Sequence, residues 1–495
     1  MKTKITGAFV IGFDGQDHVV YRQGEVVYEG NRIRFVGHGY DGPVDQTIDA
    51  GQAIISPGLI DLDALADIDH AILDTWQPAE LDAGIQWSEE YYLHRRHDVF
   101  SLEEELFKRK YALVQLILNG ITTAMPIASE FYKGWAESYT EFAGVAAIAG
   151  ELGLRIYLGP SYRSGITVTR RDGTRAVQWD EQLGLAGLAD AVRIVEEFDG
   201  AYDGLVRGCL LPCRIENVTV DLLRRTKAAA DVLGCHVRLH CLQGLHELRF
   251  LREWYDKAPL ELLDAVGLLG PRMLIPHAVY IGGHSQNREP YRGELELLAS
   301  TGASVIHCPL TSARYANAIE SFDRYRRAGV NIALGTDSFP PDMIRVMDTG
   351  SNVAKLMEHR KSAGAAADYF RAATLGGAKA LGREDLGRLA PGALADLIIV
   401  DLSQLRVGPI DDPIRTLLMN TGGPFVRTVI INGRTVMQDG QLPTIDDADL
   451  KRRGQAYFDK LKAAYPERDN FHRPLDELFP PSFRTINRPT TGAQA

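Results

Sequence analysis

Four side chains that can bind a metal ion or move a proton come directly after short apolar runs of the chain. They are His240 after VRL, His277 after MLIP, His307 after SVI and Asp337 after NIALGT. Imidazole nitrogens and a carboxylate oxygen are ligands that a divalent cation such as Zn, Mn, Co or Fe accepts. A single histidine at a strand end is most often an ordinary hydrogen-bonded residue, but four such positions in succession predict a metal site.

These side chains can meet only if their strands end at one edge of a parallel sheet. Between about residues 100 and 388, amphipathic helical segments alternate with apolar runs, as in LFKRKYALVQLILNG before ITTAMPI and DRYRRAGV before NIALGTDS. Such alternation is typical of right-handed βαβ units. In a (β/α)8 barrel the carboxyl ends of the strands form the active-site face. We therefore expect an α/β protein built on a TIM barrel.

The two ends of the chain have a different pattern, with β-branched runs separated by Gly, Asn and Asp. Gly30-Asn31 and Asn432-Gly433 each lie between two such runs and predict hairpin turns. We expect both ends to pair into one composite β-sandwich domain. The expected divisions are 1–56 and 388–445 for the sandwich, 57–387 for the barrel, and 446–495 for a C-terminal helix and tail.

Composition and charge exclude several classes of protein. The 495 residues are 45% hydrophobic and 24% charged with a net charge of -11, which indicates a globular chain with no electrostatic basis for nucleic-acid binding. No apolar stretch is long enough for a membrane span, and the N-terminus has no signal-peptide pattern. Five cysteines without zinc-finger spacing suit reduced thiols. We expect a cytoplasmic protein that acts on a small molecule.

Several longer segments resemble one protein family. They are HCLQ, LIPHAVYI, SVIHCPLTSARYANAIESFDRYRRAGVNIALGTDS, GRLAPGALADLIIVDL and VIINGRTVMQDG. Together they are similar to the amidohydrolase superfamily, and more narrowly to its aminohydrolase and triazine-hydrolase branch, from the PGLID turn to the NG hairpin. The resemblance implies a urease-like fold, in which a metal-holding (β/α)8 barrel is flanked by a β-sandwich made from both termini.

The resemblance also implies a role for each of the four side chains. His240 and His277 fall on metal-ligand positions. Asp337 falls on the position that approaches the metal and takes a proton from its water, and His307 on that of a polar group facing the substrate. A divalent metal lowers the pKa of bound water toward neutrality, so an aspartate beside it can accept the proton and pass it to the leaving group.

The first barrel strand departs from the family pattern. Where the branch has a His-x-His pair after PGLI, this chain has Asp63-Ala64-Leu65. Asp63 can still bind a cation through oxygen, whereas Leu65 cannot. The missing ligand could come from the loop containing Asp67, Asp69 and His70, although such an acidic loop could equally be a solvated or helix-capping segment.

Two further departures concern the chemistry. Gln243 stands where deaminases of the branch have the Glu of an HxxE element, and Gln cannot exchange a proton. The fourth-strand segment VRGCLLPCRIENV contains no lysine that could become carboxylated and bridge two metals. We therefore expect Gln243 to contact the substrate and the site to hold one divalent ion, Zn first, with Co, Mn or Fe as alternatives.

A long segment between Ile72 and Phe100 carries aromatic residues, including Trp76 and Trp87. Long ordered loops at a barrel mouth often act as lids, so we expect these two side chains to contact the substrate. The alternative is an aromatic patch that packs a helix onto the barrel or onto a neighbouring subunit.

These observations predict a metal-dependent hydrolase that cleaves a non-peptide C–N bond in an amide-, carbamate- or urea-like small molecule. An aminohydrolase or chlorohydrolase of a nitrogen heterocycle is the alternative enzyme. A degenerate, metal-free barrel that serves as a binding subunit is the non-enzymatic alternative, suggested by Leu65. By analogy with the fold, we expect a homo-oligomer.

Overall fold

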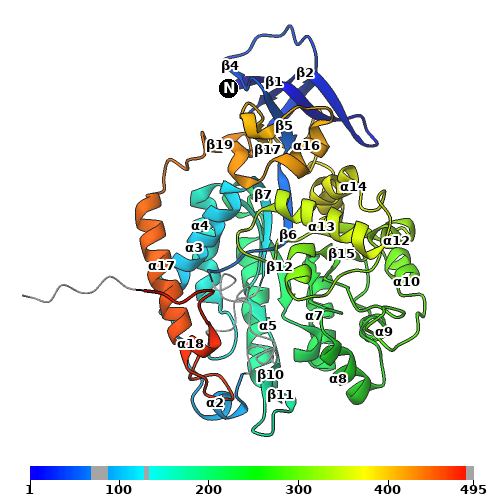
Figure 1. Cartoon of the computed structure of the whole chain (residues 1–495), viewed down its shortest axis with the longest axis vertical. Helices are drawn as coiled ribbons and strands as arrows, with labels where there is room; N and C mark the ends of the chain where they lie inside the picture. The colour runs from blue at the N-terminus through cyan, green and yellow to red at the C-terminus, as the bar shows by residue number, and fades with distance from the viewer. Residues whose placement is uncertain (69–86, 128–132, 487–495) are drawn as a thin grey trace, which may run out of the picture.

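The computed structural model describes residues 1–68, 87–127 and 133–486. Figure 1 shows a barrel of strands surrounded by helices, with a second sheet at one end of it where the first and last strands of the chain lie side by side. The predicted fold class, a (β/α)8 barrel plus a β unit composed of both termini, is confirmed.

Eight parallel strands form the barrel, and each is paired with its neighbour in chain order. Nearly all of their residues are buried, as expected for strands covered on both faces. The strands are β6 (Leu59–Ala64), β7 (Ile121–Pro126), β8 (Arg155–Leu158), β12 (Val206–Pro212), β13 (His236–Arg238), β14 (Met273–Pro276), β15 (Ser304–His307) and β16 (Asn331–Leu334).

The segment GTD after β16 closes the barrel against β6. The backbone N–H and the hydroxyl of Thr336 donate to Asp61 at 3.0 and 2.6 Å, and the backbone N–H of Asp337 donates to the carbonyl of Asp63 at 2.9 Å. A Cβ on Gly335 would lie 2.5 Å from the Cβ of Asp63, so only glycine permits this approach. The first and last strands are thereby joined at the edge where the site residues lie.

Helices surround the barrel and begin with capping residues. Ser101 and Glu104 form a capping box at the start of α3, and Thr219 caps α7, which ends at Gly234 in the left-handed conformation. No helix within the described ranges is long and apolar enough to cross a membrane. The helices are α2 (Glu89–His94), α3 (Leu102–Leu118), α4 (Tyr139–Leu152), α5 (Glu181–Phe198), α6 (Ala201–Gly204), α7 (Val220–Leu233), α8 (Leu245–Tyr255), α9 (Pro259–Ala265), α10 (Glu294–Thr301), α11 (Pro309–Arg314), α12 (Phe322–Arg327), α13 (Met343–Met357), α14 (Ala366–Arg371), α15 (Gly377–Ala380), α16 (Pro413–Asn420), α17 (Asp447–Ala463) and α18 (Leu475–Leu478).

The second sheet combines strands from both termini in the order β19-β18-β17-β5-β1-β2-β3, with β4 also paired to β1. Both predicted hairpins are present, at Gly30-Asn31 between β2 and β3 and at Asn432-Gly433 between β18 and β19. The strands are β1 (Lys2–Phe13), β2 (His18–Glu29), β3 (Arg32–Gly37), β4 (Gln46–Asp49), β5 (Ala53–Pro57), β17 (Leu397–Asp401), β18 (Val426–Ile431) and β19 (Arg434–Met437).

Two smaller features lie beside the barrel. Strand β9 (Ser161–Tyr162) pairs with β12, and β10 (Gly165–Thr169) forms a hairpin with β11 (Arg175–Trp179). Helix α17, the amphipathic helix expected near the C-terminus, packs on α3, where Lys460 pairs with Glu104 at 2.8 Å. The C-terminal segment therefore covers the outside of the barrel.

Candidate metal centre

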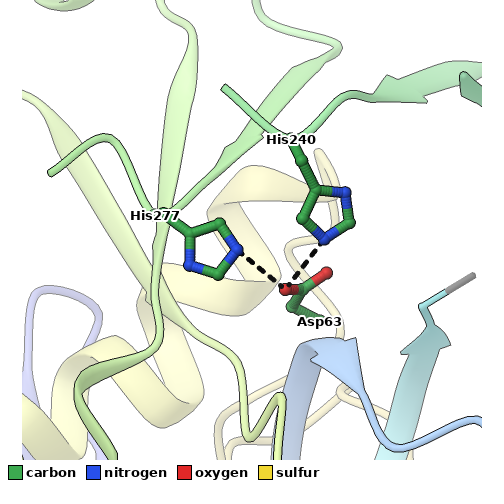
Figure 2. A group of neighbouring side chains, drawn as sticks. All are labelled: Asp63, His240 and His277. Carbon is green, nitrogen blue, oxygen red and sulfur yellow. Dashed lines mark ion pairs between the residues drawn. The ribbon is translucent and has the colours of Figure 1, made fainter. Parts of the chain in front are cut away.

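The barrel brings side chains from four strand ends together. Figure 2 shows Asp63, at the end of β6, with the imidazoles of His240 and His277 turned toward its carboxylate. Its Oδ2 lies 3.4 Å from His240 Nε2 and 3.9 Å from His277 Nε2, and His277 Nε2 lies 3.8 Å from Asp337 Oδ2. Asp63, His240 and His277 have the spacing of metal ligands at the carboxyl edge of the barrel, and Asp337 belongs to a neighbouring group that shares His277 with them.

The ring of His240 is oriented by a backbone carbonyl. Its Nδ1 lies 2.9 Å from the carbonyl oxygen of Cys213, which can only accept, so Nδ1 carries the hydrogen. Nε2 is therefore the ring nitrogen left to bind a cation, and it is the atom that faces Asp63. This arrangement, with a carbonyl fixing the tautomer behind the ring, is typical of histidine metal ligands.

His277 is buried, and burial lowers its pKa to about 4, so the ring is neutral at pH 7. Its Nε2 is buried without a hydrogen-bond partner among the described residues, although it faces two carboxylates. A buried polar atom in this state costs free energy unless something else binds it. The donor set and this unpartnered nitrogen both fit a divalent cation.

Asp63 is fully buried. Burial alone raises the pKa of this carboxyl, but the imidazole of His240 and the guanidinium of Arg238 outweigh burial and hold the pKa below its usual value. The carboxylate is therefore ionised at neutral pH, as a metal ligand must be.

The backbone at the mouth of the barrel is strained. Leu242, His277 and Asp337 have φ values of 60°, 69° and 40°, in the left-handed region that non-glycine residues rarely adopt. Hydrogen bonds hold these turns, including those from the backbone N–H groups of Val279 and Tyr280 to the carbonyl of Leu242 at 3.0 Å. Strain of this kind is often concentrated at functional sites, where it fixes the direction of a side chain.

His307 ends β15 and Gln243 follows β13, and both lie outside this cluster. His307 is buried, its ring packs near Phe322 and Tyr369, and burial lowers its pKa to about 3, so it is neutral at pH 7. Its Nδ1 and the Oε1 of Gln243 are buried without hydrogen-bond partners within the described part of the chain. Each offers a polar atom to a ligand.

The other predicted residues are not brought to this cluster. Asp67 is ion-paired at 2.7 Å with Lys108, so it belongs to a buried charge network rather than to the cluster. The ring of Trp87 packs on Tyr465 at a centroid distance of 5.4 Å, which favours the packing alternative for this residue. Trp76, Asp69 and His70 lie outside the described residues.

Sequence reasoning missed two residues of the centre. Cys308 Sγ lies 3.6 Å from Asp63 Oδ2 and joins His277 and Asp337 in a second group with ligand-like spacing. Arg238 Nη1 lies 3.4 Å from Asp63 Oδ1. Strand alternation could have found Arg238, because residues two apart on a strand share a face and Arg238 precedes His240 by two.

The fold and this centre agree with the comparison with protein families. Residues 108–436 match the model of the Amidohydrolase family, and the chain therefore belongs to this family. The predicted membership of the amidohydrolase superfamily is confirmed, and so is the predicted class of enzyme, a hydrolase of carbon–nitrogen bonds.

Curated relatives extend over nearly the whole chain. The 5-methylthioadenosine/S-adenosylhomocysteine deaminase of Natronomonas pharaonis is 28% identical over 469 residues, which cover 92% of this chain and 97% of that protein. The 5'-deoxyadenosine deaminase of Methanosarcina barkeri is 26% identical over 464 residues, covering 92% and 98%.

Two solved structures share the fold. An adenosine deaminase from Xanthomonas campestris with bound zinc has a TM-score of 0.75 at 22% identity and covers 93% of this chain and 99% of its own. An atrazine chlorohydrolase from Arthrobacter aurescens TC1 complexed with zinc has a TM-score of 0.74 at 20% identity, covering 92% and 99%.

Proposed function

We propose that the protein hydrolyses a non-peptide C–N bond of a small molecule with one divalent metal ion, zinc being the first choice. The observation that carries this proposal is the pair of ligand-spaced groups that share His277, with Asp63 and His240 on one side of it and Asp337 on the other. The bound zinc in the two structures named above supports the choice of metal. The absence of a lysine on β12 supports a single ion.

In this proposal the ion would be held by His240, His277, Asp63 and Asp337. A divalent cation in such a site lowers the pKa of water and polarises the bond to be cleaved. Asp337 then accepts the proton of the attacking water and donates it to the leaving nitrogen. His307 is neutral at pH 7, so it stabilises the developing oxyanion by donating one ring N–H rather than through a full positive charge.

The substrate class depends on Gln243. A carboxamide can donate or accept hydrogen bonds, but it cannot transfer a proton to a ring nitrogen. This favours an open-chain amide, carbamate or urea, in which Asp337 alone can protonate the leaving group. Gln243 then contacts the substrate with its amide group.

A second candidate is hydrolytic deamination of an amino-substituted heterocycle such as an adenine nucleoside. The observation that favours it is the similarity, over more than nine tenths of the chain, to curated deaminases of 5-methylthioadenosine, S-adenosylhomocysteine and 5'-deoxyadenosine. With Gln243 in place of a carboxylate, this reaction requires Asp337 to carry every proton transfer.

Elemental analysis combined with a substrate panel tests the proposal. The purified protein should contain about one equivalent of metal, lose activity on chelation and regain it with zinc. Anilides, phenylureas and aryl carbamates should release amines, whereas 5'-methylthioadenosine would release ammonia if the second candidate is correct. Metal content near zero after expression in zinc-supplemented medium, with no turnover, would instead support the metal-free binding subunit.

Assembly and compartment belong to the same proposal. We infer a homo-oligomer from the barrel architecture alone, and a cytoplasmic location from the odd number and the spacing of the five cysteines, which suit reduced thiols. Light scattering of the purified protein tests the first, and fractionation of the producing cells tests the second.

A further inference from the structure

Arg238 is a buried cation in the interior of the barrel. It is the last residue of β13, two residues before His240, and only 2% of it is exposed. Removing a guanidinium from water is costly unless its charge and its N–H groups are matched by nearby acceptors. The partners of Arg238 therefore indicate what holds it there.

The partners lie on the first two strands of the barrel. Its Nη1 donates to the carbonyl of Met125 at 2.8 Å and, more weakly, to that of Leu62 at 3.4 Å, while Nη2 donates to the carbonyl of Pro126 at 2.8 Å. Three backbone acceptors fix the plane of the guanidinium. The planar fork of arginine suits this arrangement, whereas a lysine ammonium could not reach the same set of acceptors.

With Arg238 in this position, the two carboxylate oxygens of Asp63 face different neighbours. Oδ1 faces Arg238 Nη1 at 3.4 Å. Oδ2 faces His240 Nε2 at 3.4 Å and Cys308 Sγ at 3.6 Å. The carboxylate therefore turns one oxygen to the guanidinium and the other to the point where the imidazoles converge.

We infer that Arg238 is a positioning residue for the metal centre, which acts by orienting Asp63 so that Oδ2 faces the cation. This inference rests on the proposed function, because it needs Asp63 to be a ligand. The Asp63–Arg238 ion pair has no net charge, as a pair of neutral imidazole ligands would have none.

Arg238→Met tests the inference through metal affinity rather than turnover. Loss of a group that orients a ligand typically weakens metal binding 10–100-fold. We expect the Kd for Zn²⁺, measured by competition with a chelator, to rise by that factor, and the absorption spectrum of the Co²⁺-loaded protein to change. Arg238→Lys keeps the charge without the fork and should give an intermediate Kd.

Arg155→Met is the matched control. Arg155 is also buried and paired with a carboxylate, Asp396, at 2.8 Å, but on the side of the barrel that faces the composite sheet. The control should lose stability and keep the wild-type Kd for Zn²⁺.

A double-mutant cycle distinguishes orientation of Asp63 from a general structural effect. In an Asp63→Asn background, Arg238→Met should change the Kd less than about twofold. Additive losses, or a wild-type Kd in Arg238→Met, would overturn the inference. If Arg238→Met does not fold, Arg238→Lys is used instead, and a wild-type Kd for Zn²⁺ in that variant would also overturn the inference.

The same data separate this inference from the proposed function. If the wild type binds no zinc, or if His240→Ala binds zinc with the affinity of the wild type, the proposed assignment of the metal centre is wrong. If the wild type and His240→Ala behave as proposed but both Arg238 variants bind zinc normally, only the role of Arg238 is wrong.

Discussion

The two histidines of the metal centre depend on their surroundings in different ways. His240 is already oriented by the carbonyl of Cys213, whereas His277 Nε2 has no protein partner in the described chain and faces two carboxylates. Asp337 can contribute both to binding and to proton transfer. Substitutions at these positions should therefore separate metal content from turnover.

We expect His240→Ala and His277→Ala each to lower both bound metal and kcat, because each removes a ligand nitrogen. Asp337→Asn should retain part of the metal through its amide oxygen but lower kcat at least 100-fold, since an amide cannot accept the proton. Elemental analysis and steady-state kinetics on the same preparations check this. Full metal content in both histidine variants would contradict the ligand assignment.

Gln243 is the residue on which substrate choice depends. Its backbone N–H and that of Leu242 donate to the carboxylate of Glu247, which fixes the turn. Gln243→Glu would place an ionisable group beside the substrate without altering this turn. We expect the variant to release ammonia from an amino-substituted heterocycle faster than the wild type does, and to hydrolyse ureas more slowly.

Gln243→Ala is the control for this substitution, because it removes the amide without adding a carboxylate and should lower both activities. Parallel assays of ammonia and amine release make the comparison. An unchanged substrate profile in Gln243→Glu would show that this position does not select the substrate.

At the scale of helices and strands, the sequence was sufficient to predict the features that depend on a few neighbouring residues, which are the hairpin turns and the strand ends. The hairpins at Gly30-Asn31 and Asn432-Gly433 and the strand ends at His240, His277 and Asp337 were all recognisable, because turn chemistry and alternation act over a few residues. These features were sufficient to predict the barrel and to place His240, His277 and Asp337 at its carboxyl edge, whereas Asp63 was identified only through the family resemblance.

Contacts between distant elements could not be predicted in the same way. The pairing of Arg238 with Asp63 joins β13 to β6, and the packing of Trp87 on Tyr465 joins two segments that are far apart in the chain. Strand alternation places Arg238 on the same face as His240, but nothing local in the sequence marks Asp63 as the partner of Arg238 or Tyr465 as that of Trp87. Both depend on how the barrel closes and on where the C-terminal segment lies.

A buried ion pair joins the barrel to the composite sheet. Arg155 on β8 donates to both oxygens of Asp396, which directly precedes β17, at 2.8 and 3.1 Å. Removing one partner leaves a buried charge unpaired, at a typical cost of about 3–5 kcal/mol. We expect Arg155→Met to lose about this much free energy of unfolding in urea.

The double variant Arg155→Met with Asp396→Leu should recover part of this loss, because it leaves no buried charge unpaired. Denaturation followed by both tryptophan fluorescence and circular dichroism would show whether barrel and sheet still unfold together. A loss below about 1 kcal/mol in the single variant would mean that the pair does not stabilise this interface.

For the molecule as a whole, burial of ionisable groups makes stability depend on pH in two opposing directions. Burial lowers the pKa of His18 and of His236 to about 4. Burial raises the pKa of Asp61 to about 7 and that of Glu247 to about 8. The two histidines favour the folded state at high pH and the two carboxyl groups favour it at low pH. The free energy of unfolding therefore depends on pH through the sum of these effects, and the effect of one group is measured by comparing the wild type with a variant that lacks it.

His236 is suited to that measurement because it lies at the start of β13, away from the metal ligands. Between pH 6.5 and about 4 the unfolded chain binds a proton at this histidine that the folded chain does not. Its contribution to stability is therefore fully present above pH 6.5 and is lost as the pH falls toward 4.

Relative to His236→Gln, the wild type should lose at most about 2 kcal/mol of unfolding free energy between pH 7.5 and pH 5. Urea denaturation of the metal-free proteins at the two pH values measures this difference, and His472→Gln, at an exposed histidine, is the control. If His236→Gln and the wild type respond equally to acid, the imidazole of His236 is not kept neutral by burial.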